Sequence, residues 1–426
     1  MADRPWRVGI YDRWLGTMGG GEKHAGAIAA VLAEHYTVEF ISHEPVDVPR
    51  LASYLGLNLR RVGLRLVPDR PDFAGVIAAS VDYDLFVNAS HFDYFAPRAR
   101  QNALIVYFPA TSVEAATALG AYNRVKRAVR LGVGPLLGER LRGTLRALMF
   151  GQTGRSSEQT FLGRAALAGF RLATQPKQQA NVLDAYQSIL AISEFTRHWI
   201  RTYWDRDSTV LYPEIAVDEL RPLPKMPWVL SVGRFFAGSH NKKQVELIRA
   251  FPQSVKGPLA GWELHLAGGY VPSESNAAYL AAVRDAIAGS SAIHLHLNCD
   301  AAELRQLYGQ SKLFWHATGL GESEAAHPER FEHFGITTVE AMAAGCVPLV
   351  IAKGGQPEIV HSGVDGYLWT TLDELIFRSA SLAGDDAERE RLARAAILRA
   401  RDFGPAAFRT GLVQALALPE DSRVGN

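Results

Sequence analysis

The sequence predicts an α/β protein with two doubly wound, Rossmann-like domains that face each other across a cleft. Three observations lead to this fold class: strand-like apolar runs alternate with helical segments along nearly the whole chain, a proline-rich stretch interrupts the series, and the series then restarts. Strands that are each followed by a helix form parallel sheets covered on both faces. Ligands of such sheets bind beyond the carboxyl ends of the strands, so we expect the functional site there.

The first half of the chain contains the elements of one such domain. Strands are predicted over residues 6–11, 36–42, 84–89, 103–108, 188–193 and 208–213. The first of them leads into a helix predicted over 21–34. Ser193 is expected to cap the helix that follows it, because its hydroxyl can accept a hydrogen bond from a free backbone N–H.

The second half repeats the pattern after a linker. The stretch RPLPKMP, residues 221–227, has three prolines in seven residues and marks the domain boundary. Further strands are predicted over 228–233, 263–268, 292–298, 312–317, 347–351 and 365–369, with helices in the gaps. We therefore expect one domain at 1–220, a second at 221–398, and a separate helical piece at 399–426, with packing back on the first domain as one option.

Composition restricts the class of protein. The chain has 426 residues, of which 48% are hydrophobic and 21% charged, which is typical of globular domains. A net charge of +1 gives no reason to expect a polyanionic partner such as nucleic acid. Cys299 and Cys346 are the only cysteines, so no disulfide framework is expected and a reducing, cytoplasmic location fits best. No apolar run reaches the roughly 18 residues of a membrane span, and the first residues lack the apolar core of a signal peptide.

One segment breaks the alternation of strands and helices. Residues 121–177 contain eleven Lys and Arg but only two acids, with basic positions among leucines at helical spacing. We expect two or three basic amphipathic helices inserted in the first domain. They are either a solvated helical excursion or a surface for anionic lipid head groups or an anionic acceptor, which would place the protein at the inner face of the membrane. Nucleic acid is disfavoured because no aromatic residues are interleaved with the basic ones.

A glycine run after the first strand is a candidate phosphate-binding turn. Gly19, Gly20 and Gly21 allow close approach of a ligand to the backbone and open a helix whose N–H groups favour an anion. The run is not the dinucleotide-binding fingerprint, because His24 stands where the third glycine is needed. A purely structural turn between strand and helix is the alternative.

Three cations follow the first strand of the second domain. Arg234 lies just past the end of strand 228–233, and Lys242 and Lys243 come at the start of the next helix. A cation is unfavourable at the start of a helix unless an anion lies there too. A diphosphate would supply that anion, and surface lysines beside a peripheral arginine are the alternative.

Two glutamates, Glu332 and Glu340, lie eight positions apart around a glycine-containing segment. A helix is predicted over 336–344, so the first glutamate precedes it and the second lies about 7–8 Å along its axis at 1.5 Å per residue. Carboxylates suit sugar hydroxyls because their oxygens accept hydrogen bonds. A phosphate could lie between them on the first-turn backbone donors of Gly335, Ile336 and Thr337. Solvent-exposed acids on a loop and a helix are the alternative.

At this point the sequence resembles a known family. The segment EHFGITTVE at 332–340, with AMAAGCVP behind it, is similar to the signature of family-4 retaining glycosyltransferases of the GT-B fold. Three other parts match in order: GGGE at 19–22, SVGRF with KKQVELIRAF at 231–251, and GGQPEIV with DGYLW at 354–369. The resemblance covers nearly all of 228–370 and is weaker in 1–215.

The resemblance implies a function and a site. It implies a retaining, metal-independent hexosyltransferase (EC 2.4) without a cofactor, which moves a sugar from a nucleotide-diphosphate sugar to a sugar, lipid-linked or other hydroxyl acceptor. The second domain would bind the donor and the first the acceptor. Arg234 and Lys242 would hold the diphosphate with Lys243 as the fallback, Glu340 the ribose, and Glu332 the sugar near its anomeric centre. The other donor-binding residues would be Gly20, Gly21, Phe334, Gly335, Ile336 and Thr337.

The chain departs from the family pattern in several places. Many relatives carry a histidine in a turn of the first domain where this chain has Phe108 before Pro109. His91, after strand 84–89, could replace it as a catalytic residue, or it could be structural. The residues 321–331 form an extra loop that either shapes the donor pocket or is plainly solvated. His294 and His296 face one side of a strand, but without a further ligand at suitable spacing no metal site is expected.

Three other classes share parts of the pattern. A nucleotide-sugar epimerase of the same architecture would use the donor without an acceptor. A non-catalytic protein that binds sugars or sugar nucleotides is another option, although sugar-binding proteins of two domains are normally exported. A dehydrogenase is disfavoured by the glycine spacing.

Overall fold

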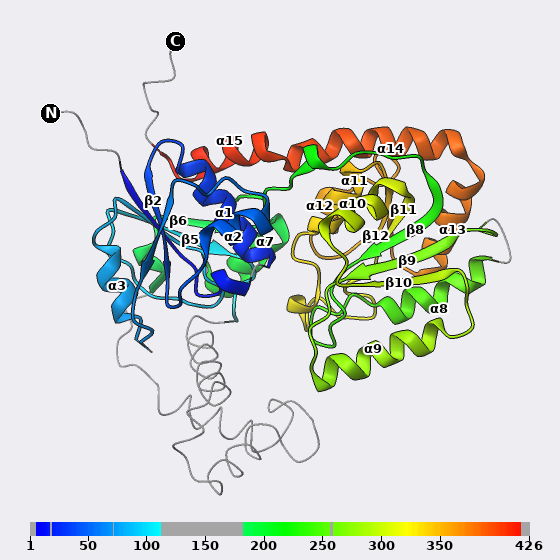
Figure 1. Cartoon of the computed structure of the whole chain (residues 1–426), viewed down its shortest axis with the longest axis horizontal. Coiled ribbons are helices and arrows are strands. Elements are labelled where there is room, and N and C mark those ends of the chain that lie inside the picture. The colour runs from blue at the N-terminus through cyan, green and yellow to red at the C-terminus, as the bar shows by residue number, and fades with distance from the viewer. Residues whose placement is uncertain (1–5, 18, 71, 112–181, 256–258, 419–426) are drawn as a thin grey trace, which may run out of the picture. The chain divides into compact units, whose positions relative to one another are not determined.

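A computed structural model describes residues 6–17, 19–70, 72–111, 182–255 and 259–418. The chain divides into two compact units, Met1–Ile189 with Ile200–Asp207 and Leu190–Trp199 with Ser208–Asn426. Each unit is built on one β-sheet flanked by helices (Figure 1). The predicted α/β class with two doubly wound sheets is confirmed. The predicted domain limits and the placement of residues 399–426 stay predictions.

The first sheet has seven strands in the order β3-β2-β1-β4-β5-β6-β7. Their bounds are Arg7–Tyr11 (β1), Thr37–Ser42 (β2), Val62–Leu66 (β3), Leu85–Asn88 (β4), Gln101–Val106 (β5), Ser188–Ala191 (β6) and Thr209–Val210 (β7). The pairings of β1 with β2 and β4, β2 with β3, β4 with β5, and β6 with β7 are parallel. The order of the strands reverses between β1 and β4, where such sheets place ligands.

Helices α1 (Gly20–Leu32), α2 (Val48–Leu55) and α3 (Ala74–Ser80) belong to this unit, while α7 (Glu194–Trp204) is divided between the two units after Trp199. Ser193 caps α7 as predicted, because its Oγ accepts a hydrogen bond from the N–H of Thr196 at 3.0 Å. β3 was not predicted from the sequence. It is an edge strand in which Gly63 and Leu66 are exposed, so it lacks the continuous apolar run of the central strands.

The second sheet has six strands, all parallel, in the order β10-β9-β8-β11-β12-β13. Their bounds are Met226–Val232 (β8), Glu263–Gly268 (β9), Ile293–Leu297 (β10), Ser311–His316 (β11), Val347–Ile351 (β12) and Tyr367–Trp369 (β13). The reversal point lies between β8 and β11. The six strands predicted in this half are therefore confirmed, with ends that shift by one or two residues.

Helices cover both faces of the second sheet. They are α8 (Gln244–Val255), α9 (Glu274–Ile287), α10 (Ala301–Gln310), α11 (Ile336–Ala343), α12 (Gln356–Ile359), α13 (Leu372–Gly384) and α14 (Asp386–Ala400). A last helix, α15 (Pro405–Ala415), follows them in the chain. In Figure 1, α8 and α9 lie on one face of the sheet, and α10, α11 and α12 lie on the other. Side-chain caps fix several starts: Ser273 for α9, Asp300 for α10 and Thr371 for α13.

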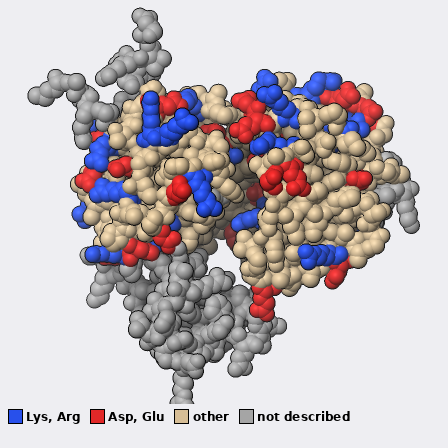
Figure 2. All heavy atoms as spheres, in the orientation of Figure 1, with Lys and Arg blue, Asp and Glu red and all other residues tan. Residues whose placement is uncertain are grey.

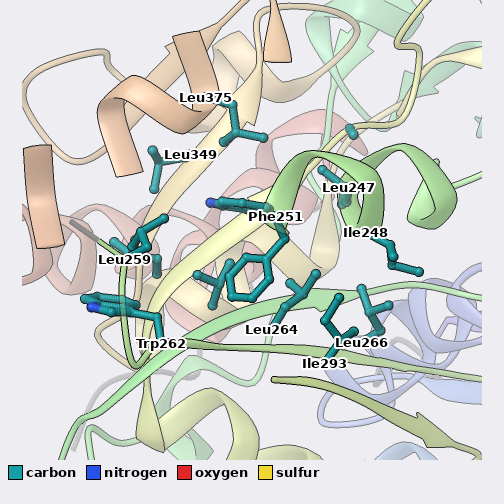
Figure 3. Packing of buried hydrophobic residues seen from close by; sticks show 14 of the residues in the cluster. Leu247, Ile248, Phe251, Leu259, Trp262, Leu264, Leu266, Ile293, Leu349 and Leu375 are labelled. Atoms are coloured by element: carbon teal, nitrogen blue, oxygen red, sulfur yellow. The ribbon is translucent and has the colours of Figure 1, made fainter. Parts of the chain in front are cut away.

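Apolar side chains join α8 to the sheet beneath it (Figure 3). Leu247, Ile248 and Phe251 of this helix lie over Leu264 of β9 and Ile293 of β10. All five are buried. Spacings of one, three and four residues along α8 place its apolar side chains on one face, while alternate residues of β9 point to that face of the sheet.

Charged side chains of both signs are interspersed on the face of the molecule in Figure 2, without a large area of one sign among the described residues. No helix of the described residues combines the length and apolar character that crossing a bilayer requires. The basic segment 121–177 lies outside the described residues, so its predicted helices and membrane contact stay predictions.

Candidate functional site

The order of the strands in the second sheet determines which loops meet at its carboxyl edge. β8 and β11 are neighbours at the reversal point, so the loop after Val232 and the end of β11 at His316 lie side by side. Arg234 follows β8 by two residues. The loop from His316 to Gly335 follows β11 and carries Glu332 to the start of α11.

A lysine, a carboxylate and a histidine form the charged centre of this edge: Lys242, Glu332 and His316. The Nζ of Lys242 donates a hydrogen bond to Oε2 of Glu332. The Nε2 of His316 lies 2.9 Å from the same oxygen. The Lys242 and Glu332 side chains are 16% and 17% exposed, so the pair is largely screened from water and its attraction is stronger than on the surface.

The charged centre keeps Glu332 ionised. Burial raises the pKa of Glu332, but the charge of Lys242 and the hydrogen bond from His316 outweigh it, and the pKa lies well below its usual value. Burial lowers the pKa of His316, although its hydrogen bond to Glu332 acts in the opposite direction. A neutral His316 donates through Nε2, so the Glu332 side chain carries the negative charge of the centre.

Both partners of Glu332 use Oε2. Among the described residues, no hydrogen bond to Oε1 is formed, so this oxygen can accept a hydrogen bond from a ligand. Thr318 Oγ1 lies 3.2 Å from Nε2 of His316 and helps to orient the ring. The carboxylate is therefore fixed on one side and available on the other.

Arg234 lies beside this centre as an uncompensated cation. Its side chain is exposed, its guanidinium lies 5.6 Å from the ring centre of Phe236, and it forms no ion pair with any described residue. The side-chain amide of Gln244 donates to the carbonyls of Gly233 at 3.2 Å and of Arg234 at 3.3 Å, which fixes the backbone here. The charges of Lys242 and Arg234 also help to lower the pKa of His240 to about 4, after burial as the main cause.

Lys243 has a different partner from Lys242. Its Nζ donates to Oε1 of Glu322 at 2.8 Å, and Arg330 donates to Oε2 of Glu322 at 3.0 Å. The extra loop 321–331 is therefore tied to the start of α8 rather than loose in solvent. The two lysines need no phosphate to offset their position before a helix, because Glu322 and Glu332 supply the negative charges. This removes one of the arguments that the sequence offered for a diphosphate.

The start of α11 is a second feature of the same edge. Gly335 precedes the helix with φ of 132°, a conformation that a residue with a side chain rarely adopts. No side chain of the described residues caps the helix, and no acid lies in its first turn. The first-turn donors that the sequence singled out, at Gly335, Ile336 and Thr337, are thus available to an anion. Phe334, which precedes them in the chain, is buried at 2% exposure.

The glycines of the GGQPEIV segment hold the loop that carries Glu332. The N–H of Gly355 donates to the carbonyl of Glu332 at 2.8 Å. A Cβ at Gly355 would lie 2.7 Å from the carbonyl oxygen of His333 and 2.8 Å from Cα of Phe334. Gly354, with φ of 62°, packs as closely against the backbone of Glu332. Close backbone packing, rather than ligand contact, explains this part of the signature.

Glu340 lies within α11, and its Oε2 accepts a hydrogen bond from the hydroxyl of Tyr308 at 2.9 Å. Burial and the nearby Glu340 carboxylate raise the pKa of Tyr308 well above its usual value, so the phenol keeps the proton that it donates. The side chain of Glu340 is partly buried, with Tyr308 behind it. The two predicted carboxylates therefore flank the start of one helix, as the spacing indicated.

The first unit holds the remaining predicted residues. Gly20 and Gly21 begin α1, whose N-cap residue Gly19 provides no side-chain cap. The hydroxyl of Tyr107 donates to the carbonyl of Gly21 at 2.9 Å, and the ring of His91 lies 5.9 Å from the ring of Tyr107. The unit thus brings His91 and the glycine turn together around one tyrosine, at the carboxyl ends of β1, β4 and β5.

Three site residues were not identified from the sequence: His316, His240 and Tyr308. His316 ends a buried strand beside the reversal point, so its place in the fold could have indicated it. His240 lies in the long loop between Arg234 and Lys242. Tyr308 lies in a helix with no local pattern around it, and only the tertiary structure brings it to Glu340.

Comparison with known proteins gives a family match for part of the chain. Residues 217–399 match the model of the family described as glycosyl transferases group 1. No curated protein matches the chain.

Solved structures share the whole architecture. The Anabaena protein Alr3699/HepE, crystallised with UDP and glucose, is 15% identical over 97% of this chain and 99% of its own, with a TM-score of 0.62. A glycosyltransferase from Rickettsia africae is 13% identical over 97% and 98%, with a TM-score of 0.63. Sucrose-phosphate synthase from Thermosynechococcus elongatus is 14% identical over 96% and 98%, with a TM-score of 0.60. At these identities the likeness shows the fold, which is GT-B.

The packing of Gly355 leads to a prediction about stability. Gly355→Ala is expected to lower the free energy of unfolding by about 1–3 kcal/mol, because the added methyl group must displace the backbone of residues 333–334. The backbone conformation itself tolerates alanine, with φ of −77°. Urea unfolding followed by tryptophan fluorescence measures the change. Gly384→Ala is the matched control, since a Cβ there meets no atom within 4 Å; equal stability of both variants would contradict the packing argument.

The charged centre leads to a prediction about pH. Because the pKa of Glu332 is lower in the folded than in the unfolded state, its stabilisation is complete above the unfolded value of about 4.3 and is lost as pH falls through the folded pKa. The difference in unfolding free energy between the wild type and Glu332→Gln should be constant from pH 7 to about pH 5.5 and shrink in more acid solution. Glu390→Gln, at a side chain 67% exposed, should show little such change. A difference that grows on acidification would show that the pKa is raised.

Proposed function

We propose that this chain is a glycosyltransferase that moves a sugar from a nucleotide-diphosphate sugar to an acceptor hydroxyl, with retention of anomeric configuration and without a catalytic metal. One observation carries the proposal. Among the described residues, Arg234 without an ion pair, the charged centre and a helix start without a side-chain cap converge at the carboxyl edge of one sheet, within residues that match the glycosyl transferases group 1 model. The UDP and glucose bound to HepE indicate the class of donor to test first.

The donor diphosphate is proposed to lie on the start of α11. Its backbone donors and the helix dipole favour negative charge, and Arg234 offers a planar pair of donors that suits phosphate oxygens. Lys242 has three ammonium protons, of which Glu332 uses one, so it can contact a phosphate without leaving the carboxylate. Lys243, held by Glu322, is assigned to the loop 321–331 and not to the diphosphate.

The proposed chemistry follows from the charges. Breaking the bond between sugar and phosphate builds negative charge on the leaving diphosphate and positive charge on the sugar ring. Arg234, Lys242 and the start of α11 stabilise the first charge, since they are in place before the reaction begins. These groups stabilise the leaving diphosphate, as a divalent ion does in other transferases. We therefore propose a metal-independent reaction. Glu332, ionised and with Oε1 available, stabilises the second charge near the anomeric carbon.

The two ends of the donor are assigned to the two glutamates. Glu340 is proposed to accept hydrogen bonds from the ribose hydroxyls, while its other interaction with Tyr308 fixes the side chain. Glu332 is proposed to accept one from the sugar. Retention of configuration rests on the likeness of residues 332–340 to the family signature. The acceptor, a sugar, lipid-linked or other hydroxyl, is assigned to the first unit, with His91 as the residue to test.

Substitution of two donor-binding residues tests the proposed site. Arg234→Ala and Glu340→Ala are each expected to weaken the binding of UDP-glucose at least tenfold, because each removes a contact with a charged or hydroxyl group of the donor. Isothermal titration calorimetry measures the affinity, and a screen of UDP-, GDP-, ADP- and dTDP-sugars by thermal shift first identifies the nucleotide.

Matched controls separate binding from folding. Arg249→Ala and Glu390→Ala replace exposed residues on α8 and α14 and should bind like the wild type. Circular dichroism should show that the two site variants remain folded. Wild-type affinity in both Arg234→Ala and Glu340→Ala would refute the site.

The stereochemistry of the product tests the reaction type. UDP-glucose is α-linked, so a retaining transfer to a panel of sugar and lipid-linked alcohols should give α-glucosides, which proton NMR identifies from the coupling of the anomeric hydrogen. A β-linked product would contradict retention. Conversion of UDP-glucose to another nucleotide sugar in the absence of any acceptor would instead show an epimerase.

A further inference from the structure

A second group of ionisable side chains lies on the sheet of the same unit, away from the donor site. Glu263 and His265 belong to β9, and His294 and His296 belong to β10. His265 is paired in register with His294, and residues two apart in a strand point to the same face. The four side chains therefore form one cluster on one face of the sheet. Neither strand alone supplies enough ligands for a metal ion, but the two strands together do.

The distances in this cluster match the spacing of metal ligands. Oε2 of Glu263 lies 3.3 Å from Nε2 of His265 and 3.3 Å from Nε2 of His294. All three atoms lie within 4.8 Å of one another. Tetrahedral zinc, with bonds of about 2.0–2.2 Å to nitrogen and oxygen, separates its ligand atoms by about 3.3–3.6 Å.

The hydrogen bonds behind the cluster direct lone pairs toward its centre. Nδ1 of His296 lies 2.9 Å from Oε1 of Glu303 and therefore carries the proton. Nε2 of a neutral His296 is then an acceptor, and Nδ1–H of His265 donates a hydrogen bond to it at 3.1 Å. This leaves Nε2 of a neutral His265 with a lone pair, facing a carboxylate oxygen of Glu263 that also only accepts.

Two acceptors at 3.3 Å repel each other unless a cation lies between them. His265 is 6% exposed, so little water reaches the space between these two acceptors. A metal ion supplies the positive charge without requiring a protonated ring. The chain of hydrogen bonds from His265 through His296 to Glu303 is also the arrangement that orients metal-binding histidines in proteins.

We propose that Glu263, His265 and His294 bind a divalent transition-metal ion of the zinc class. Imidazole nitrogens and a carboxylate oxygen form a ligand set typical of Zn²⁺. The His294 and Glu263 side chains are 40% and 41% exposed, so an ion can enter from solvent and keep a water molecule as its fourth ligand.

The position of the site indicates a structural role. Glu263 is the first residue of β9 and His294 the second of β10, so the ligands lie at the amino ends of strands whose carboxyl ends face the donor site. β10 is the edge strand of the sheet. An ion bound here joins this edge strand to its neighbour and takes no part in sugar transfer, so the site is independent of the metal-independent reaction proposed above.

Metal titration of the full-length, untagged protein tests the proposal after treatment with a chelator. Calorimetry with ZnCl₂ should give one high-affinity ion per chain, and Co²⁺ should give the visible absorption of a tetrahedral site. His294→Gln and Glu263→Gln, at partly exposed positions, should each weaken Zn²⁺ binding at least tenfold. His35→Gln replaces an exposed histidine of the first unit and should bind like the wild type.

Thermal unfolding gives a second readout. Zn²⁺ should raise the unfolding temperature of the wild type and of His35→Gln, because it binds only the folded state, and should leave that of His294→Gln nearly unchanged. The proposal is overturned if the wild type binds no Zn²⁺, or if both substitutions at Glu263 and His294 leave its affinity unchanged.

Discussion

The ion pair between Lys242 and Glu332 is the interaction on which the arrangement of the carboxyl edge of the second sheet depends. It joins residues 90 positions apart, from the loop after β8 and the loop before α11, at the point where the strand order reverses. A buried carboxylate without this partner would carry a large cost of desolvation. The glycines at 354 and 355 pack against the backbone of the same loop. This packing fixes the position of the ionised carboxylate relative to the start of α11.

Local sequence patterns predicted the second sheet, most of the first sheet and the position of the two carboxylates around one helix start. Short apolar runs, each followed by a helix, predicted all six strands of the second sheet, because central parallel strands are buried on both faces. The spacing of Glu332, Gly335 and Glu340 placed the carboxylates on either side of a helix start, since one element contains them all. The strand at 62–66 was missed because an edge strand is partly exposed and its sequence is mixed.

Contacts between distant elements were beyond the reach of the sequence. The sequence does not distinguish the two adjacent lysines, yet Lys242 binds Glu332 and Lys243, whose φ is positive, binds Glu322. His294 was set aside for lack of a further ligand, while Glu263 and His265 lie about 30 residues earlier in the chain and meet it only through the register of two parallel strands. The register in which β9 and β10 pair, rather than the spacing of these residues in the sequence, brings the cluster together.

The state of Glu332 limits what it can do in the proposed reaction. A general base works best with a pKa near the working pH, and the pKa of Glu332 lies well below its usual value, so it accepts protons poorly. Its contribution must then come from charge and from hydrogen bonding through Oε1. In the proposed reaction, Lys242 would donate hydrogen bonds both to this carboxylate and to the phosphate that we assign to the start of α11. In that arrangement the negative charge of Glu332 lies where the sugar would become positive, and the positive charge of Lys242 lies where the diphosphate would become negative. Both fixed charges therefore favour the charge separation that develops as the bond between sugar and phosphate breaks.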